Sequence, residues 1–262
     1  MPVQLTIAHN ITDQINLLAS REEHSEFELR RIRREIEQLK GVDACQYYMI
    51  MGMFYSVVGD KAESISNHEK SLKLSSETIF LENYAFSLKR LGAGPEALQI
   101  LLRAFDAAPT EEVLEEVAHA MIYTGDLNEF ERTLQRFARA NPDKDPASSS
   151  SVSYIVSLQG KLARAKVSYQ DLKLSMDLVQ DLIWRKGYRN AIEAINFDTG
   201  SFDDVPHVDV SIKLKTRSCD ALFEINEGIA EAMAGAEHIE AWNRLVFTVC
   251  DWHGTPEEHN VA

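Results

Sequence analysis

The chain has 262 residues, of which 45% are hydrophobic, and a formal net charge of −14 at pH 7. This length and composition are sufficient for two globular domains with buried cores. The acidic excess argues against nucleic-acid binding, because a phosphate backbone requires clustered Lys and Arg side chains. A basic protein or peptide is the partner that the charge favours.

The cysteines and the apolar segments indicate a cytoplasmic protein. The longest apolar run, residues 47 to 59, is too short to span a bilayer, and the first ten residues lack the basic-then-apolar order of a signal peptide. Cys45, Cys219 and Cys250 are odd in number and widely spaced, unlike the disulfide framework of a secreted domain. We therefore expect neither a membrane segment nor disulfides.

Apolar residues at helical spacing predict a helical hairpin over residues 11–18 and 27–39. We expect this hairpin to cap the region that follows. Its second helix carries a dense basic cluster that alternates with glutamates. These residues are Arg30, Arg31, Arg33, Arg34, Glu28, Glu35 and Glu37. Such a balance of charges is typical of a solvated helix face.

Glycine recurs at a constant interval of 33 residues, at Gly59, Gly92 and Gly125, each between two apolar-periodic segments. Small residues align in the same frame on the first helix of each unit, at Gly52, Ala85 and Ala118. A fixed period of this length predicts stacked helical hairpins, in which a glycine with a positive φ ends the first helix. Proline ends the second and third units, at Pro109 and Pro142.

These residues resemble the tetratricopeptide repeat (TPR) family over residues 44 to 142, about half of the chain. The best unit reads Tyr84-Ala85, Leu88, Leu91-Gly92, Glu96-Ala97-Leu98, Ala104 and Pro109. The sequence departs from the family at His68, which replaces an aromatic residue, and at Phe130, where a small residue is typical. The resemblance implies a helical solenoid whose first helices line a concave groove for extended or helical peptides.

By position in the repeat, this groove would be formed by residues from three units. The partner-binding residues we expect are Met49, Met53, Glu82, Phe86, Lys89, Glu112, Glu115 and His119. The two methionines have an alternative role as contacts with the capping hairpin. Family members that bind a peptide carboxylate use a basic clamp, of which only Lys89 is present, so a basic or amphipathic partner suits the groove better.

Residues 141 to 153 contain two prolines, a run of serines and no apolar periodicity. We place the domain boundary here, which gives a repeat domain over residues 1–145 and a second domain over residues 146–262. The predicted fold class is mainly α, with a TPR-like solenoid followed by a small α+β domain.

The second domain is predicted as two helices, a β-hairpin, a helix and a final strand. The segments are 154–165, 169–186, 191–197, 208–215, 218–236 and 245–252. The hairpin connection, residues 198–207, is long for a turn. Three strands make a small sheet, so we hypothesise that residues 3–7, which alternate in polarity, add an edge strand, or that two chains pair their sheets in a homodimer.

Function is predicted from the repeats, because no phosphate loop, serine elbow or paired metal motif is present. The leading hypothesis is a non-enzymatic adaptor or chaperone-like protein without a cofactor. One alternative is a metal-dependent hydrolase or phosphoryl-transfer enzyme that uses acidic residues near 198–209. Another is an antitoxin, immunity or regulatory protein that neutralises a basic effector.

Overall fold

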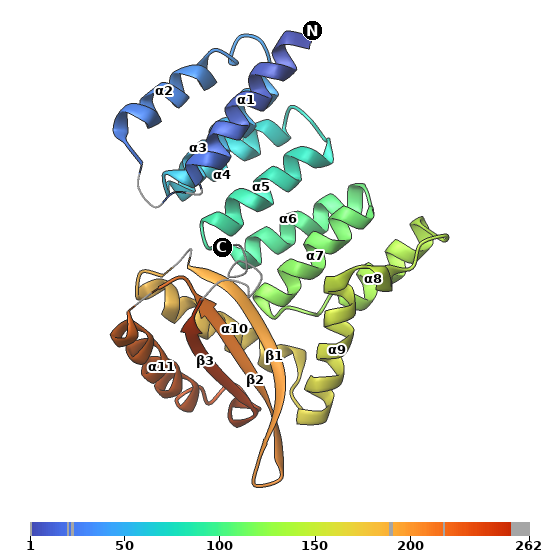
Figure 1. Ribbon diagram of the computed structural model, residues 1–262. Helices are drawn as coiled ribbons and strands as arrows, with labels where there is room; N and C mark the ends of the chain where they lie inside the picture. Colours follow the sequence, from blue (N-terminus) through green and yellow to red (C-terminus); the bar gives the residue numbers. More distant parts are fainter. Residues whose placement is uncertain (1, 20, 22–23, 189–190, 217, 253–262) are drawn as a thin grey trace, which may run out of the picture. The chain divides into compact units, whose positions relative to one another are not determined.

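The computed structural model describes residues 2–19, 21, 24–188, 191–216 and 218–252, and of residues 2–7 the backbone alone. Figure 1 shows a long series of helices followed by a small sheet. The chain divides into two compact units, Met1–Val113 and Leu114–Ala262. The predicted fold class, mainly helical with a small α+β region at the end, is confirmed.

The first unit consists of consecutive helices joined by short loops. They are α1 (Pro2–Ala19), α2 (Glu26–Glu37), α3 (Ala44–Val57), α4 (Lys61–Leu72), α5 (Thr78–Arg90) and α6 (Gly94–Ala107). Gly59 follows α3 with a φ of 81°, and Gly92 follows α5 with a φ of 68°, as predicted for glycines that end helices. Helix α3 packs against α4 and α5, so neighbouring hairpins share a core. Membership of the TPR family stays a prediction.

The N-terminal segment is helical, and the predicted edge strand at residues 3–7 is wrong. These residues form the first turns of α1. Farther along α1, Ile11, Ile15 and Leu18 are buried at helical spacing. The alternation at residues 3–7 is too short to determine a strand. The helix that the later apolar residues stabilise includes residues 3–7 as its first turns.

A histidine in the core explains the departure of the second helix of the first repeat from the family pattern. His68 is buried, its ring stacks on Tyr84 with a centroid separation of 4.9 Å, and its Nε2 lies 2.8 Å from Ser87 Oγ. A Cβ at Gly52 would lie 2.5 Å from the His68 ring, so glycine is required for this packing. Burial lowers the pKa of His68 to about 3, which keeps the ring neutral at pH 7.

The second unit contains the third predicted repeat and the helices of the predicted α+β domain. They are α7 (Glu111–Thr124), whose first residues precede the unit boundary, α8 (Phe130–Ala140), α9 (Ser150–Ala165), α10 (Tyr169–Arg185) and α11 (Cys219–Ala234). Gly125 follows α7 with a φ of 68°, as predicted. The helices predicted at 154–165, 169–186 and 218–236 are confirmed within a few residues.

The Pro- and Ser-rich segment at residues 141–153 is ordered by local hydrogen bonds. It contains a short 3-10 helix, Pro146–Ser148, and the Ser149 side chain caps α9 by accepting from Val152 N. The division into compact units falls earlier, between Val113 and Leu114. The predicted domain division at residue 145 therefore stays a prediction about independent folding.

The sheet has the strand order β1-β2-β3, with β1 (Ile192–Phe202), β2 (Val205–Leu214) and β3 (Leu245–Asp251). The first two strands are antiparallel, and β3 runs parallel to β2 after the crossover through α11. On β2 every second residue is buried, as its alternating sequence predicts. These residues are Val208, Val210, Ile212 and Leu214. Helices α9 and α11 pack against the sheet.

The hairpin connection is a two-residue turn, so the long loop predicted at residues 198–207 is wrong. Phe202 pairs directly with Val205, and Asp203 and Asp204 between them have φ values of 46° and 61°. Two positive φ values in a two-residue turn are the geometry that joins twisted antiparallel strands most directly. Asp tolerates a positive φ better than most residues do. Because Asp is common both in tight turns and in longer loops, the composition of this segment did not distinguish the two. Figure 1 shows the tip of the hairpin extending past the start of β3, where Leu245 pairs with Val208.

Both edges of the sheet have backbone groups bound by helix side chains. On β1, Phe197 N donates to Tyr154 Oη at 2.8 Å, and Lys161 Nζ donates to the Phe197 carbonyl. On β3, Val249 N donates to Asn226 Oδ1, and Asn226 Nδ2 donates to the Val249 carbonyl, both at 2.8 Å. These contacts occupy groups that an added strand would use. Homodimerisation stays a prediction, but strand pairing at these positions requires the contacts to break.

Candidate partner-binding surface

The predicted groove residues of α3 lie in the hydrophobic core of the first unit. Met49 is 5% exposed and Met53 is 1% exposed. Both belong to a cluster of buried residues that also includes Ile15 of α1 and Ile32 of α2. These methionines therefore contact the capping hairpin, as the alternative interpretation predicts. A partner cannot reach them while this hairpin is packed.

The predicted groove residues of α5 are accessible. The Phe86 side chain is 47% exposed, and Glu82 and Lys89 are partly exposed. Ile79, two helical turns before Phe86 on the same side of α5, is 48% exposed. These positions form a mixed apolar and charged surface on a rigid helix, which we call the α5 surface.

Arg90 extends the α5 surface, although the repeat frame did not select it. Its guanidinium lies over the Phe86 ring, 4.8 Å from the ring centroid. Burial lowers the pKa of Arg90 to about 10, and Nη1 is buried without a hydrogen-bond partner among the described residues. The spacing of four residues between Phe86 and Arg90 is the sequence signal that could have indicated this pair.

A desolvated guanidinium nitrogen without an acceptor is costly, because it has lost its hydrogen bonds to water. Arg90 as a residue is partly exposed, so a carbonyl or carboxylate oxygen could reach the accessible part of its side chain, although not the buried Nη1. An apolar side chain brought to Phe86 would at the same time cover the exposed ring. The α5 surface is therefore suited chemically to an amphipathic protein segment.

The predicted residues of α7 divide into exposed and internally bonded side chains. Glu112 and His119 are exposed. Glu115 accepts hydrogen bonds from Ser149 Oγ, from Ser150 Oγ at 3.1 Å and from Ser151 N at 3.3 Å. Burial alone would raise the pKa of Glu115, but the serine hydrogen bonds hold it below its ordinary value. Glu115 thus joins α7 to the start of α9, and this role differs from the predicted one.

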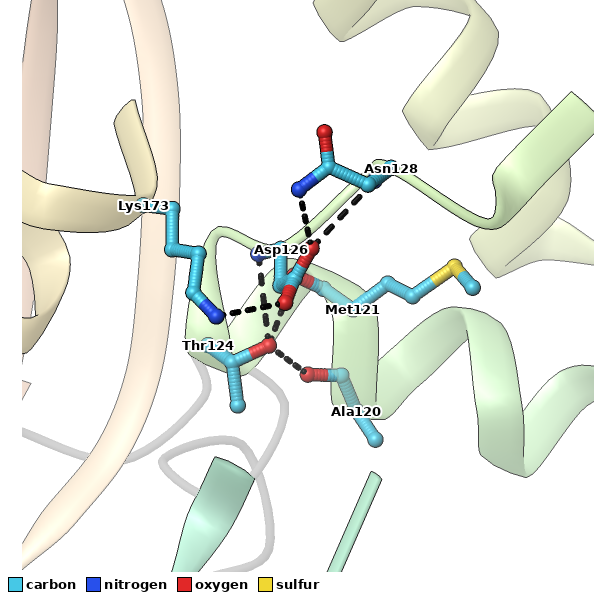
Figure 2. A network of polar contacts seen from close by, with 6 residues as sticks. All are labelled: Ala120, Met121, Thr124, Asp126, Asn128 and Lys173. Atoms are coloured by element: carbon cyan, nitrogen blue, oxygen red, sulfur yellow. Dashed lines mark hydrogen bonds and ion pairs between the residues drawn. The ribbon is translucent and has the colours of Figure 1, made fainter. Parts of the chain in front are cut away.

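A second polar network holds the elbow between α7 and α8 (Figure 2). Lys173 of α10 donates to Asp126 Oδ2 at 2.8 Å, and Asn128 Nδ2 donates to Asp126 Oδ1 at 2.8 Å. Thr124 Oγ1 donates to the Ala120 carbonyl at 2.8 Å. These hydrogen bonds all join residues of the second unit, so we interpret the network as a structural contact that holds the elbow in place.

Gly125, within this elbow, packs directly on α10. A Cβ at Gly125 would lie 2.7 Å from Met176 Cγ. Gln180, one turn farther along α10, donates to the Tyr123 carbonyl at 2.5 Å. Helix α10 therefore packs on the end of α7 and on the elbow that follows it.

Asp198 and Asp209 lie opposite each other on β1 and β2, but the acidic residues near 198–209 do not form a metal-binding group. Asp203 and Asp204 form the turn, Asp198 pairs with Lys161 at 3.3 Å, and Asp209 Oδ1 lies 3.3 Å from His207 Nε2. Among the described residues, no group of three or more His, Cys, Asp or Glu side chains is arranged to hold a metal ion. The arrangement gives the metal-dependent hydrolase hypothesis no supporting geometry.

Comparisons with known proteins add no further constraint. No protein-family model matches the chain, and neither a curated protein nor a solved structure does. In the part of the chain that the structure describes, every helix is too short or too polar to cross a lipid bilayer.

Proposed function

We propose that the chain is a non-enzymatic adaptor or chaperone-like protein that binds a partner protein or peptide on the α5 surface. The proposal retains a TPR-like repeat array and a cytoplasmic location. Phe86 under the desolvated Arg90 guanidinium is the observation that carries it. Aromatic and Arg side chains are the residue types that contribute most to binding at protein interfaces.

The chemistry of the α5 surface favours an amphipathic segment as the partner. Such a segment would place an apolar side chain on Phe86 and an oxygen acceptor near Arg90. Glu82 is a partly exposed acidic residue of the same helix, in keeping with the expectation of a basic or amphipathic ligand. For a metal-dependent enzymatic role, the described residues offer no group of three or more His, Cys, Asp or Glu side chains that could hold the metal ion.

Site-specific photocrosslinking tests this proposal. A photoreactive amino acid is introduced at Phe86, and the matched control carries it at Leu74, which is 55% exposed in the same unit. We expect a discrete crosslinked partner from position 86 and none from position 74, with the partner identified by mass spectrometry.

Binding of that partner is then measured by calorimetry for Phe86→Ala and Leu74→Ala. Loss of an aromatic anchor is expected to weaken binding about tenfold or more, whereas loss of Leu74 should leave the affinity unchanged. An unchanged affinity for Phe86→Ala, or equal crosslinking from both positions, would show that the α5 surface is not the binding site.

A further inference from the structure

The outward side of α2 carries an aromatic side chain among arginines. Phe27 is 80% exposed. Helical spacing places Arg30, Arg31 and Arg34 on the same side as Phe27, opposite the buried Ile32 and Ile36. We call Phe27, Arg30, Arg31 and Arg34 the α2 stripe.

The glutamates of α2 are largely engaged by other side chains. Glu26 pairs with Arg30 at 2.6 Å, and Glu28 pairs with Arg21 at 3.2 Å. Glu35 accepts from Gln14 Nε2 at 2.9 Å. Glu37 accepts from Tyr47 Oη at 3.3 Å. The equal numbers of Arg and Glu on α2 therefore do not cancel side chain by side chain.

Two arginines of α2 have no acidic partner in the described part of the chain. Arg33 and Arg34 are exposed and form no ion pair with any residue that the structure describes. Arg31, beside Arg34 on the α2 stripe, donates to Gln14 Oε1 at 3.1 Å and lies 3.7 Å from Glu35, contacts that keep its charge at the exposed surface of the helix. The stripe thus presents positive charge next to an exposed phenyl ring, although the whole chain is acidic.

The physical chemistry of the stripe selects the partner. Guanidinium groups bind carboxylates through paired N–H donors, and an exposed ring is covered best by an apolar side chain. A second copy of the chain bound through the same stripe would place Arg against Arg, which is repulsive. A lipid bilayer is disfavoured because the stripe offers one apolar side chain for insertion, whereas membrane-surface helices bury a continuous apolar face.

We propose that the α2 stripe binds an acidic protein segment that carries an apolar side chain. The α2 stripe lies on a different helix from the α5 surface. It favours an acidic partner, whereas the α5 surface favours a basic or amphipathic one. Carboxylates pair with Arg34 and its neighbours, and the apolar side chain packs on Phe27. The α2 stripe therefore adds a second, independent binding specificity to the first unit.

The probe is a fluorescent peptide of alternating glutamate and leucine, with a lysine-and-leucine peptide of the same length as the reference. Binding to the full chain is followed by fluorescence anisotropy at low and at physiological salt. We expect the acidic peptide to bind with an affinity that falls as salt is added. Arg34→Glu and Phe27→Ala are each expected to weaken binding about tenfold or more.

Matched controls separate the stripe from general electrostatics and from loss of structure. Arg139→Glu makes the same change in net charge at an exposed position of α8, and Phe223→Ala removes a phenyl ring that is 69% exposed on α11. Both controls should bind like the unchanged protein. Circular dichroism of Arg34→Glu and Phe27→Ala should be unchanged, because both side chains point away from the core.

Three results would overturn the proposal. The first is no binding of the acidic peptide to the unchanged protein. The second is equal weakening by Arg34→Glu and Arg139→Glu, which would show non-specific charge attraction. The third is binding to phosphatidylglycerol vesicles that depends on Phe27 and Arg34 while the acidic peptide fails to compete, which would identify a membrane surface as the ligand.

Discussion

Different kinds of contact stabilise the interior of each of the two units of this protein. In the first unit, helices that are neighbours in sequence pack as hairpins around apolar side chains, and His68 and Gly52 fit together within one such hairpin. In the second unit, polar side chains tie segments that are far apart in sequence, such as Glu115 to Ser151 and Asn226 to Val249. Periodic patterns report the first kind of contact, whereas the second kind leaves no pattern in the sequence.

The largest expected effect is a dependence of the stability of the first unit on pH. Unfolded His68 takes up a proton near pH 6.5, but folded His68 does so only near pH 3, so the unfolded state binds more protons between these values. Stability of the first unit therefore falls as the pH falls through this window, by about 3 kcal/mol between pH 6.5 and 4. Residue-resolved hydrogen exchange should show it in α3 to α6.

The variant His68→Phe tests whether this histidine is responsible. It should flatten the pH dependence of exchange in the first unit, whatever its effect on stability at pH 7. His238→Ala, which changes an exposed histidine of the second unit, is the matched control. An unaltered pH dependence in His68→Phe would contradict the assignment.

A smaller effect is expected when the tie between α7 and α9 is removed. Glu115→Ala deletes the carboxylate that accepts from Ser149, Ser150 and Ser151. Loss of hydrogen bonds to a half-buried charge should lower the free energy of unfolding of the second unit by about 2 kcal/mol. Glu227→Ala, an exposed glutamate on α11, should change it by less than about 0.5 kcal/mol.

Urea unfolding followed by tryptophan fluorescence reads out this change, because Trp184, Trp242 and Trp252 all lie in the second unit. A cost for Glu115→Ala no greater than that for the control would mean that the serine contacts do not hold α7 in place.

The smallest expected effect concerns the free edge of the sheet. Asn226→Ala leaves the Val249 N–H and carbonyl without their partner and should cost about 1.5 kcal/mol of stability. The uncovered edge of β3 should also promote association of chains. Light scattering after size-exclusion chromatography should detect larger oligomers of Asn226→Ala than of the control Asn243→Ala, which changes an exposed asparagine just before β3. A monomeric Asn226→Ala variant would show that Asn226 does not protect the edge.

The comparison explains which parts of the fold the sequence could predict. Glycines at a constant interval identified the elbows, and the alternation in β2 identified its buried face, because both depend on local geometry. The N-terminal helix and the tight turn at Asp203 and Asp204 were mistaken because short alternations and turn-forming residues fit more than one conformation.

The candidate site was predictable only in part. The repeat frame found Phe86 because its position on the first helix of a hairpin sets its exposure. It also selected Met49 and Met53, since a frame cannot indicate that a capping hairpin covers the first repeat. Glu115 has its partners in a serine run that is distant in sequence, and no local pattern connects the two.

The central claim is that partners bind to exposed helix faces of the first unit while the sheet edges of the second unit stay closed. Hydrogen exchange of the full chain, with and without the partner identified by crosslinking at position 86, tests it most directly. Protection confined to α5, with β1 and β3 exchanging as in the free protein, is the predicted result. New protection along β1 or β3, with none in α5, would contradict the account.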